Sequence, residues 1–322
     1  MGGKAIANLI NKPEADRITL EQKNKYLQLF NHTPKLKSVR EIEEKETFGD
    51  IDLLYAGDEK IDFFVNRFKN AGYQYNGQIK NGTITSLAIG DHQIDVIRVS
   101  EAKLEIACHY FNDNDKGNLV GVIYNRLGFI YGHDGLYLRM DFDKLFLSDD
   151  INEILQFIKY NPSMIDKMVN FGFKTYEEMF ETVMSSPYFD SEYYRFENLN
   201  NENRTRNKKR KTYQTFVDYL ETRPKRSLTF SKEMMTYQAL DFFGKEKEYI
   251  KVLKEKENNK LNKQLINGDL ITKITGYQRE ELGKFIVFLK KEEPFMMEYT
   301  YYYQPEEIEA KIKDASLRYQ EK

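Results

Sequence analysis

"TFGDIDLLYAG" (residues 47–57) carries two aspartates, Asp50 and Asp52, one residue apart in an apolar run that predicts a β-strand. Side chains at positions i and i+2 of a strand point to the same face, so the two carboxylates lie side by side while Ile51 and Leu53 face the opposite layer. Two anions held this close repel each other, and a cation between them relieves the repulsion. A hard divalent cation with oxygen ligands is the natural candidate.

A third aspartate stands in a similar setting. Asp95 interrupts the apolar run of "HQIDVIRVS" (residues 92–100), which follows the β-rich run 83–90 across a Gly90-Asp91 turn and predicts a hairpin. If the strand of Asp95 lies beside the strand of Asp50 and Asp52, three carboxylates converge on one patch. Such a set can hold two Mg²⁺ ions, with Mn²⁺ as a substitute, and support phosphoryl chemistry.

The elements around these strands predict an α+β protein. Thr19 begins a helix over residues 20–31, and Asp58 is expected to cap a second helix that stops at Gly72. A further strand is expected at 135–142. Helical periodicity dominates afterwards, so we expect a mixed α/β domain over residues 1–148 followed by an all-helical domain over residues 149–322.

Composition limits the function classes. Lys and Arg (49) nearly balance Asp and Glu (51) in the 322 residues, so overall charge does not indicate a polyanionic partner. The single cysteine, Cys108, is expected to be a buried small hydrophobe in a reducing compartment. No histidine has zinc-ligand spacing, no apolar run approaches the ~20 residues of a membrane span, and the N-terminus does not resemble a signal peptide. A cytoplasmic protein without a membrane partner is therefore expected.

Positive charge is concentrated locally. Residues 203–226 hold nine Lys or Arg against two acidic residues. Such a run is either a solvated surface or a contact for a phosphate backbone, and the nearby Tyr213 and Phe216 fit the second interpretation. The candidate RNA-binding residues are Arg204, Arg206, Lys208, Lys209, Arg210 and Lys211.

The aspartate motifs resemble a known superfamily. Gly49-Asp50-Ile51-Asp52-Leu53, followed by Ile94-Asp95-Val96, is similar to the DNA polymerase β-type nucleotidyltransferases, and "MGGKAI" with "KETFGDIDLL" is most similar to the nucleotidyltransferase-like proteins of bacteriophages. The resemblance implies Asp50, Asp52 and Asp95 as catalytic metal ligands, with Asp95 as the base or base-assisting ligand for a 3′-hydroxyl. It implies transfer of a nucleoside monophosphate from an NTP to an RNA 3′ end, with tRNA favoured, in the host cytoplasm if the protein is phage-encoded.

A second resemblance lies near the C-terminus. "INGDLITKITGYQREELGKFIVFLKKEE" (residues 266–293) is similar to the helical tail element of CCA-adding enzymes and poly(A) polymerases, which helps to hold tRNA. A generic pair of helices, with Gly276 at the C-terminus of the first, explains the same pattern. Both interpretations stay open.

The sequence departs from the superfamily in its phosphate-binding region. No Gly-Gly or Gly-Ser pair occurs in residues 38–48, so either Gly2-Gly3 or the set Ser38, Lys45 and Gly49 is expected to serve the nucleotide. Arg126 and Arg139 are further triphosphate candidates, and Arg98 is the weakest because strand alternation turns it away from Asp95. "SEYYR", with Glu192 and Arg195, is only a faint version of the base-reading motif of CCA-adding enzymes.

An Asp-x-Asp pair also occurs in other kinds of site. An EF-hand is excluded because "DIDLLYAGDEKI" lacks oxygen donors and the central glycine at the required steps. A glycosyltransferase using a metal-bound sugar nucleotide and a purely structural role for the carboxylates remain alternatives. Within nucleotidyl transfer, the acceptor can instead be a protein or small-molecule hydroxyl, and a non-catalytic RNA-binding protein can keep the same scaffold. The base transferred and the oligomeric state are not specified by the sequence.

Overall fold

A five-stranded sheet organises the first part of the chain in the computed structural model, which describes residues 4–141 and 143–321. Its strand order is β2-β4-β7-β6-β5. The strands are β2 (Leu36–Ser38), β4 (Asp50–Tyr55), β5 (Tyr75–Asn81), β6 (Ile84–Ile89) and β7 (His92–Arg98). β4 and β7 are parallel and the other neighbours are antiparallel. The predicted hairpin and the predicted adjacency of the two aspartate strands are both confirmed.

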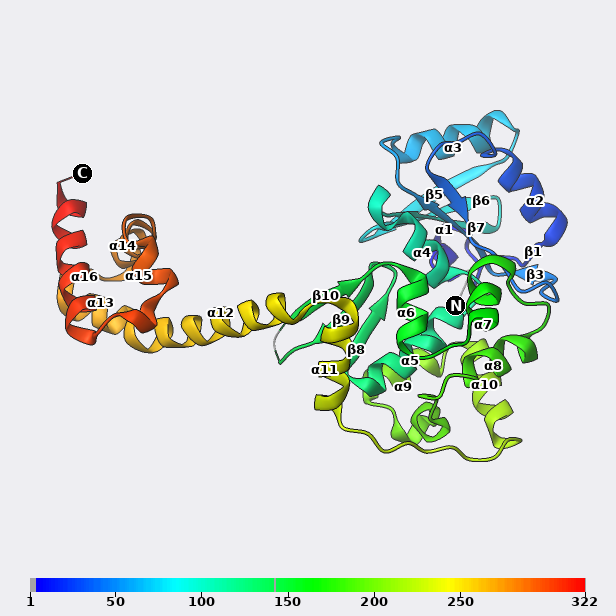
Figure 1. The fold of residues 1–322 in the computed structure, drawn as a ribbon. Helices are drawn as coiled ribbons and strands as arrows, with labels where there is room; N and C mark the ends of the chain where they lie inside the picture. Colours follow the sequence, from blue (N-terminus) through cyan, green and yellow to red (C-terminus); the bar gives the residue numbers. More distant parts are fainter. Residues whose placement is uncertain (1–3, 142, 322) are drawn as a thin grey trace. The chain divides into compact units, whose positions relative to one another are not determined.

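Helices cover both faces of this sheet (Figure 1), and each face buries different apolar clusters. Ile51 and Leu53 pack with Phe64 and Phe68 beneath α2 (Leu20–Gln28) and α3 (Ile61–Asn70). On the other face, Leu54 packs under α4 (Leu104–Phe111), which follows the short 3-10 helix η1 (Glu101–Lys103). At the opposite end of that face, Ala88 is covered by the segment around α1 (Ala7–Ile10). The space between α1 and α4 is therefore where the sheet carries polar side chains.

Helix boundaries agree with the sequence in part. The Thr19 hydroxyl accepts a hydrogen bond from the Gln22 N–H at 3.2 Å and caps α2, as predicted, but α2 ends at Gln28 instead of near residue 31. Asp58 was predicted as the cap of α3, which is wrong, because the N-cap is Lys60. The Arg98 side chain binds the carbonyl groups of Gly57 and Glu59, which keeps this turn out of the helix.

A second, three-stranded antiparallel sheet follows α5 (Lys116–Leu127). Its order is β10-β9-β8, with β8 (Phe129–Gly132), β9 (Gly135–Arg139) and β10 (Lys144–Ser148). The strand predicted at 135–142 therefore ends at Arg139. A two-stranded sheet pairs β1 (Ile18–Thr19) with β3 (Thr47–Phe48). The mixed α/β class is confirmed, and no strand follows β10 among the described residues.

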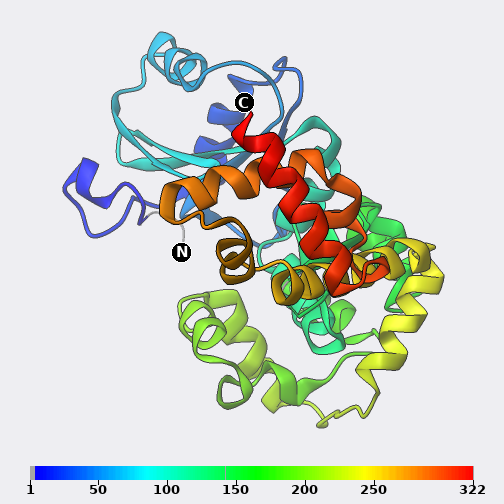
Figure 2. The ribbon, with the colours of Figure 1, turned by 90° about the vertical axis from the view of Figure 1, so that its left-hand side faces the viewer.

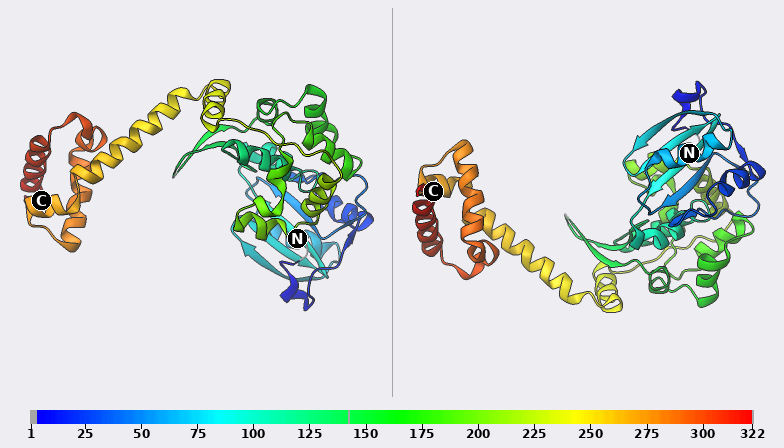
Figure 3. Two further views of the ribbon diagram at one scale, coloured as in Figure 1. Left: turned by 90° about the horizontal axis from the view of Figure 1, so that it is seen from below. Right: turned by 90° about the horizontal axis from the view of Figure 1, so that it is seen from above.

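The chain divides into two compact units, residues 1–243 and residues 244–322. The predicted boundary at residue 148 falls inside unit 1. Helices from beyond residue 148 complete the core of this unit; for example, the buried Tyr194 hydroxyl donates to the Leu119 carbonyl at 2.7 Å. Figures 2 and 3 show this helical part, with α9 and α10 in light green and α11 in yellow beside β10. The elements are α6 (Ile151–Phe157), α7 (Pro162–Asp166), η2 (Lys167–Phe171), α8 (Tyr176–Met184), η3 (Ser191–Tyr194), η4 (Phe196–Asn198), α9 (Asn201–Asn207), α10 (Lys211–Glu221) and α11 (Lys232–Phe243).

A buried ionic network ties these helices to the central sheet. Asp113, fully buried, accepts hydrogen bonds from the Arg40 guanidinium at 2.9 Å and from the buried Lys116 ammonium at 2.8 Å. Both cations also donate to the Met168 carbonyl, at 2.9 and 3.0 Å. Arg40 follows β2, Asp113 follows α4 and Met168 lies in η2, so three distant segments meet at one carboxylate.

All regular secondary-structure elements in the described residues of unit 2 are helices. Its core contains Phe285, Leu289, Ile308 and Ile312. Gly276 ends the first short helix of the 266–293 segment with a φ of 76°, a left-handed conformation that favours glycine and agrees with the predicted helix end. The elements are α12 (Glu246–Leu265), α13 (Gly268–Thr275), α14 (Arg279–Glu292), α15 (Pro294–Glu298), η5 (Thr300–Tyr302) and α16 (Pro305–Gln320).

The structure bears on two expectations from composition: that Cys108 packs as a small hydrophobe, and that the chain has no membrane span. Cys108 is partly buried against the α4 cluster, and burial raises the pKa of its thiol, which suits a packing role and not a nucleophile. Across residues 4–141 and 143–321, no helix combines the length and the apolar character that crossing a bilayer would require.

The Asp113 network provides a test of what holds unit 1 together. We expect Asp113→Asn to lower the unfolding free energy by about 3 kcal/mol, because it leaves the buried Lys116 and Arg40 without their counter-ion. Asparagine tolerates the φ of 60° at this position, so backbone strain does not contribute. Urea denaturation at pH 7 measures the change. Asp62→Asn, on the exposed surface of α3, is the matched control and should cost less than about 1 kcal/mol. Equal effects of the two substitutions would contradict the role of Asp113.

Candidate metal centre

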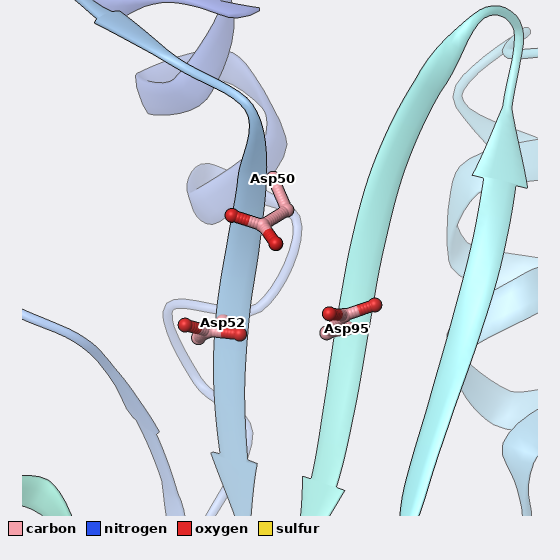
Figure 4. A group of neighbouring side chains, drawn as sticks. All are labelled: Asp50, Asp52 and Asp95. Atoms are coloured by element: carbon pink, nitrogen blue, oxygen red, sulfur yellow. The ribbon is translucent and has the colours of Figure 1, made fainter. Parts of the chain in front are cut away.

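Three carboxylates meet on the face of the sheet between α1 and α4. The parallel register of β4 and β7 places Asp52 directly beside Asp95, and Asp50 lies two residues earlier on the same face (Figure 4). One carboxylate oxygen from each residue lies within 4.8 Å of the others, and all three side chains are partly exposed. Oxygen ligands in this arrangement suit a hard divalent cation. This group can hold a metal ion, and no other group of three such ligands occurs among the described residues.

The electrostatics of the centre are those of anions that lack a counter-ion. Burial, together with the charge of Asp95, raises the pKa of Asp50 to about 6. Burial and the two neighbouring aspartates raise the pKa of Asp52 well above its usual value. Burial also raises the pKa of Asp95. A bound cation would reverse these shifts, because it stabilises the ionised carboxylates.

Asp95 is oriented by its neighbours in the sheet. The Gln93 amide donates to both oxygens of Asp95, at 3.1 and 3.0 Å, and Ser86 on β6 lies directly opposite Asp95. Hydrogen bonds from Ser86 and Gln93 lower the pKa of Asp95 and oppose part of the burial effect. The side-chain oxygen of Gln93 in turn accepts a hydrogen bond from the Ala5 backbone N–H at 3.0 Å. Because Gln93 is buried and both the oxygen and the nitrogen of its side-chain amide are hydrogen-bonded, it holds the Asp95 carboxylate in a fixed position.

Two lysines lie on one side of the centre and share a glutamate. Glu41 accepts hydrogen bonds from Lys23 at 3.1 Å and from Lys45 at 2.6 Å. Both ammonium groups also lie over the Phe48 ring, at 4.3 and 5.0 Å from its centroid. The charge of Lys45 lowers the pKa of both Asp50 and Asp52, so this predicted residue does lie within electrostatic reach of the carboxylates.

Lys45 also connects the centre to the helical part of unit 1. Its ammonium donates to the Asn114 side chain at 2.7 Å, and the Asn114 amide donates to the Tyr176 hydroxyl of α8 at 2.5 Å. Asn114 directly follows Asp113 of the buried network. The position of Lys45 is therefore fixed by the same segment that joins the helices to the sheet.

The other predicted nucleotide-binding residues of the first 100 positions do not all lie at the candidate metal centre. Gly49 forms the bend that leads directly into Asp50. Ser38 pairs with Leu53, so alternation places its side chain on the face opposite to the carboxylates, and the structure does not bring it to the centre. Arg98 also lies on that opposite face, over the Tyr55 ring, as expected. Gly2 and Gly3 lie outside the described residues.

Arg126 and Arg139, both predicted to bind the triphosphate, have different surroundings in the structure. The Arg126 guanidinium pairs with Asp190 and donates to the Leu228 carbonyl, both at 2.6 Å. It therefore joins α5 to the 190–230 segment, which is a structural role. Arg139, at the end of β9, is exposed and lines a cavity considered below.

The six candidate RNA-binding residues of the basic tract (residues 203–226) separate into structural and exposed cations. Arg204 donates to the carbonyl groups of Phe196 and Leu199 at 2.8 and 2.7 Å, and Arg210 pairs with Asp115. The remaining four side chains are exposed and have no ion-pair partner in the part of the chain that the structure describes: Arg206, Lys208, Lys209 and Lys211.

The faint base-reading motif is occupied by internal contacts. Glu192 and Arg195 pair with each other at 3.0 Å, and Arg195 also pairs with Glu221 of α10 at 2.7 Å. These contacts explain both residues as parts of the helical packing.

Three residues of the centre were not predicted from the sequence: Gln93, Lys23 and Glu41. Gln93 could have been found, because it lies two positions before Asp95 on the same strand and so shares its face. Lys23 could have been found as the cation on the apolar stripe of α2, three and seven residues before Tyr26 and Phe30. Glu41 lies in a loop, and no periodic pattern points to it.

Comparisons with known proteins leave the family open, because no family model matches the chain and no curated protein is significantly similar to it.

Metal binding should depend on pH in a defined window. The pKa of Asp50 is raised to about 6, so the metal-free native state keeps a proton that the unfolded chain has already released, and its stability falls as the pH rises towards that value. Ligand carboxyls must be ionised, so Mg²⁺ should raise the melting temperature more at about pH 7.5 than at about pH 5. Thermal melts with and without Mg²⁺ at both pH values measure this effect. Asp52→Asn should abolish the Mg²⁺-dependent shift, whereas an equal shift in that variant would show that the ion binds elsewhere.

Proposed function

We propose that this protein is a Mg²⁺-dependent nucleotidyltransferase that moves a nucleoside monophosphate from an NTP to an RNA 3′ end. The observation that supports the proposal is the convergence of Asp50, Asp52 and Asp95 on adjacent parallel strands, on a partly exposed face of a mixed sheet. The resemblance of the Gly49–Leu53 and Ile94–Val96 motifs to the DNA polymerase β-type superfamily supplies the reaction class, and tRNA is the favoured acceptor.

Each residue of the centre has a role in this chemistry. Two divalent ions, Mg²⁺ or Mn²⁺, would supply charge neutralisation for the triphosphate and a lowered pKa for the attacking hydroxyl. Asp50 and Asp52 would bind them side by side. Asp95, held by Gln93, would complete the ligand set and assist removal of the proton from the 3′-hydroxyl. The new bond joins this oxygen to the α-phosphorus, and the bond to the β-phosphate oxygen breaks to release pyrophosphate.

Lys45 supplies positive charge beside the carboxylates. It lies within electrostatic reach of Asp50 and Asp52, and its contacts with Glu41 and Asn114 fix its position. A lysine placed here favours a triphosphate, because it adds to the charge that neutralises the departing pyrophosphate.

The exposed cations of the basic tract support a polyanionic acceptor. Arg206, Lys208, Lys209 and Lys211 have no ion-pair partner in the described residues, so no internal contact accounts for their concentration in one short segment. Unpaired surface cations at this density are the expected contacts of a phosphate backbone.

Loss of a metal ligand should remove activity without removing the fold. We expect Asp50→Ala and Asp52→Ala to reduce nucleotidyl transfer by at least about 10²-fold. Folding should be retained, since each change removes a carboxylate that repels its neighbours. Incubation with each of four radiolabelled NTPs, with purified tRNA and with host lysate, measures whether label enters RNA, protein or neither.

Asp62→Asn, an exposed carboxylate on α3, is the control and should keep full activity. Label in protein alone would assign a different acceptor. Absence of label with every NTP, together with RNA binding that needs no Mg²⁺, would contradict catalysis and favour a non-catalytic RNA-binding protein. Unfolding of either alanine variant would point to a structural role for the aspartates.

The basic tract should determine the salt dependence of RNA binding. Replacing Lys208, Lys209 and Lys211 by Ala should reduce the slope of log affinity against log salt by about 2, given about 0.7 per neutralised phosphate of a single strand. Filter binding of RNA over a series of salt concentrations gives this slope. An unchanged slope would show that the lysines are only a solvated surface.

A further inference from the structure

A polar cavity lies in unit 1, apart from the metal ligands. Its volume is about 330 Å³, at the small end of ligand-binding pockets. Residues of α4 and α5, of β8 and β9, and of the segment from η3 to α9 line it, and none of the three aspartates of the candidate metal centre does. Neither the metal centre nor the packing of the helices explains why polar groups gather here.

Two arginines line this cavity without a partner. Arg139, at the end of β9, and Arg206, in α9, are both exposed, and within the described residues neither guanidinium group makes a hydrogen bond or ion pair. The residues that line the cavity include no Asp or Glu. A cavity with two guanidinium groups and no carboxylate favours an anionic ligand, and guanidinium matches phosphate geometry well.

The cavity also contains amide groups with unused hydrogen-bonding capacity. The Asn125 side-chain oxygen accepts from the Tyr193 hydroxyl at 3.1 Å, and the Asn118 amide nitrogen approaches the buried Asn207 oxygen at 3.5 Å. The Asn125 NH₂ group and the Asn118 oxygen have no partner within the described part of the chain. One free donor and one free acceptor match the mixed donor and acceptor edge of a nucleobase.

Aromatic side chains complete the lining. Tyr110, Tyr131 and Tyr193 are partly exposed and contribute to the wall. Tyr110 and Tyr131 pack edge to face at 5.4 Å, which fixes their orientation. Aromatic rings in single-strand binding sites stack on bases, at about 1–3 kcal/mol for each base.

Arg206 connects this cavity to the basic tract. It also lines a neighbouring, more open concavity of about 570 Å³ together with Lys209 and Arg210, where Glu202 is the single acidic residue. A strand whose phosphates follow Lys209 and Arg206 is thereby led to the tyrosine- and asparagine-lined cavity.

We infer that this cavity binds one unpaired nucleotide of a single-stranded RNA segment, with its base among Tyr110, Tyr131 and the free amides and its flanking phosphates on Arg139 and Arg206. The identification of that RNA as the acceptor rests on the proposed function, but the binding itself does not. A duplex does not fit this description, because its bases are stacked and paired.

Gly121 offers a way to fill the cavity without changing its charge. It lines the cavity from α5, and a Cβ added there would meet only Tyr131, at 3.8 Å and beyond, so an alanine fits without a clash. A leucine extends further into the same space. Both residues favour a helix more than glycine does, so neither change should weaken α5.

The experiment is fluorescence anisotropy of the full chain with a 5′-labelled single-stranded RNA of about twelve nucleotides, in EDTA. We expect Gly121→Leu to weaken binding about tenfold or more with an unchanged salt slope, because it removes stacking and no charge. Arg139→Ala and Arg206→Ala should weaken binding and each reduce the salt slope by about 0.7. Gly121→Ala should bind nearly as the wild type does.

The controls separate the cavity from general electrostatics. Lys60→Ala removes an exposed cation at the start of α3 and should leave affinity unchanged. A duplex RNA of the same length should compete poorly. The inference would be overturned by wild-type affinity in Gly121→Leu, by equal competition from the duplex, or by displacement of the RNA with ATP, which would make the cavity a site for free nucleotides.

This outcome is independent of catalysis. Binding is measured without a metal ion and can be repeated in Asp50→Ala, so loss of nucleotidyl transfer does not affect it. Cavity-dependent binding in a protein that transfers no label would keep this inference and reject the proposed enzyme. Transfer of label to RNA by a protein whose RNA binding is unchanged in Gly121→Leu, Arg139→Ala and Arg206→Ala would keep the proposed enzyme and reject this inference.

Discussion

The parallel pairing of β4 with β7 brings three carboxylates together on one face of the sheet, and the candidate metal centre depends on this constraint. Asp52 and Asp95 are direct neighbours in the register, so while the strands stay paired their repulsion is relieved by a bound cation or by protonation. Apolar packing resists separation of the strands on every side. Ile51 and Leu53 are buried beneath α2 and α3, and Leu54 is buried beneath α4. The free energy of these contacts keeps the carboxylates in an arrangement that a divalent cation can complete and that no cation of the described chain completes.

The contacts of Lys23 and Lys45 explain why no lysine of the described chain neutralises the negative charge of the three aspartates. Glu41 accepts hydrogen bonds from both Lys23 and Lys45, so the two ammonium groups are engaged beside the carboxylates and not between them. No hydrogen bond or ion pair joins any lysine or arginine to Asp50, Asp52 or Asp95 among residues 4–141 and 143–321. Gln93 contributes in a different way, because a neutral amide orients Asp95 without cancelling its charge. A purely structural aspartate cluster would be expected to have a cationic partner.

The sequence was informative where periodicity determines geometry. Strand alternation predicted that Asp50 and Asp52 share a face, and the Gly90-Asp91 turn predicted the hairpin of β6 and β7. The sequence was not informative where contacts between distant residues determine the domain boundary or the face on which a side chain lies. The change from a mixed to a helical sequence pattern near residue 148 is not the boundary between the two units, because Met168 and Tyr194 contact residues from the first half of the chain. Ser38 was predicted as a replacement for the missing glycine pair before the aspartates, but the register with Leu53 places its side chain on the other face. The cavity at Arg139 and Arg206 joins residues that no local pattern connects.

The most direct measurement of the central claim is anomalous diffraction from crystals grown with Mn²⁺ and a non-hydrolysable NTP analogue. The account predicts an anomalous peak bound by oxygens of Asp50, Asp52 and Asp95, at about 2.1 Å from them, and a triphosphate beside Lys45. A centre without a peak, with the Lys23 or Lys45 ammonium moved between the carboxylates, would contradict it.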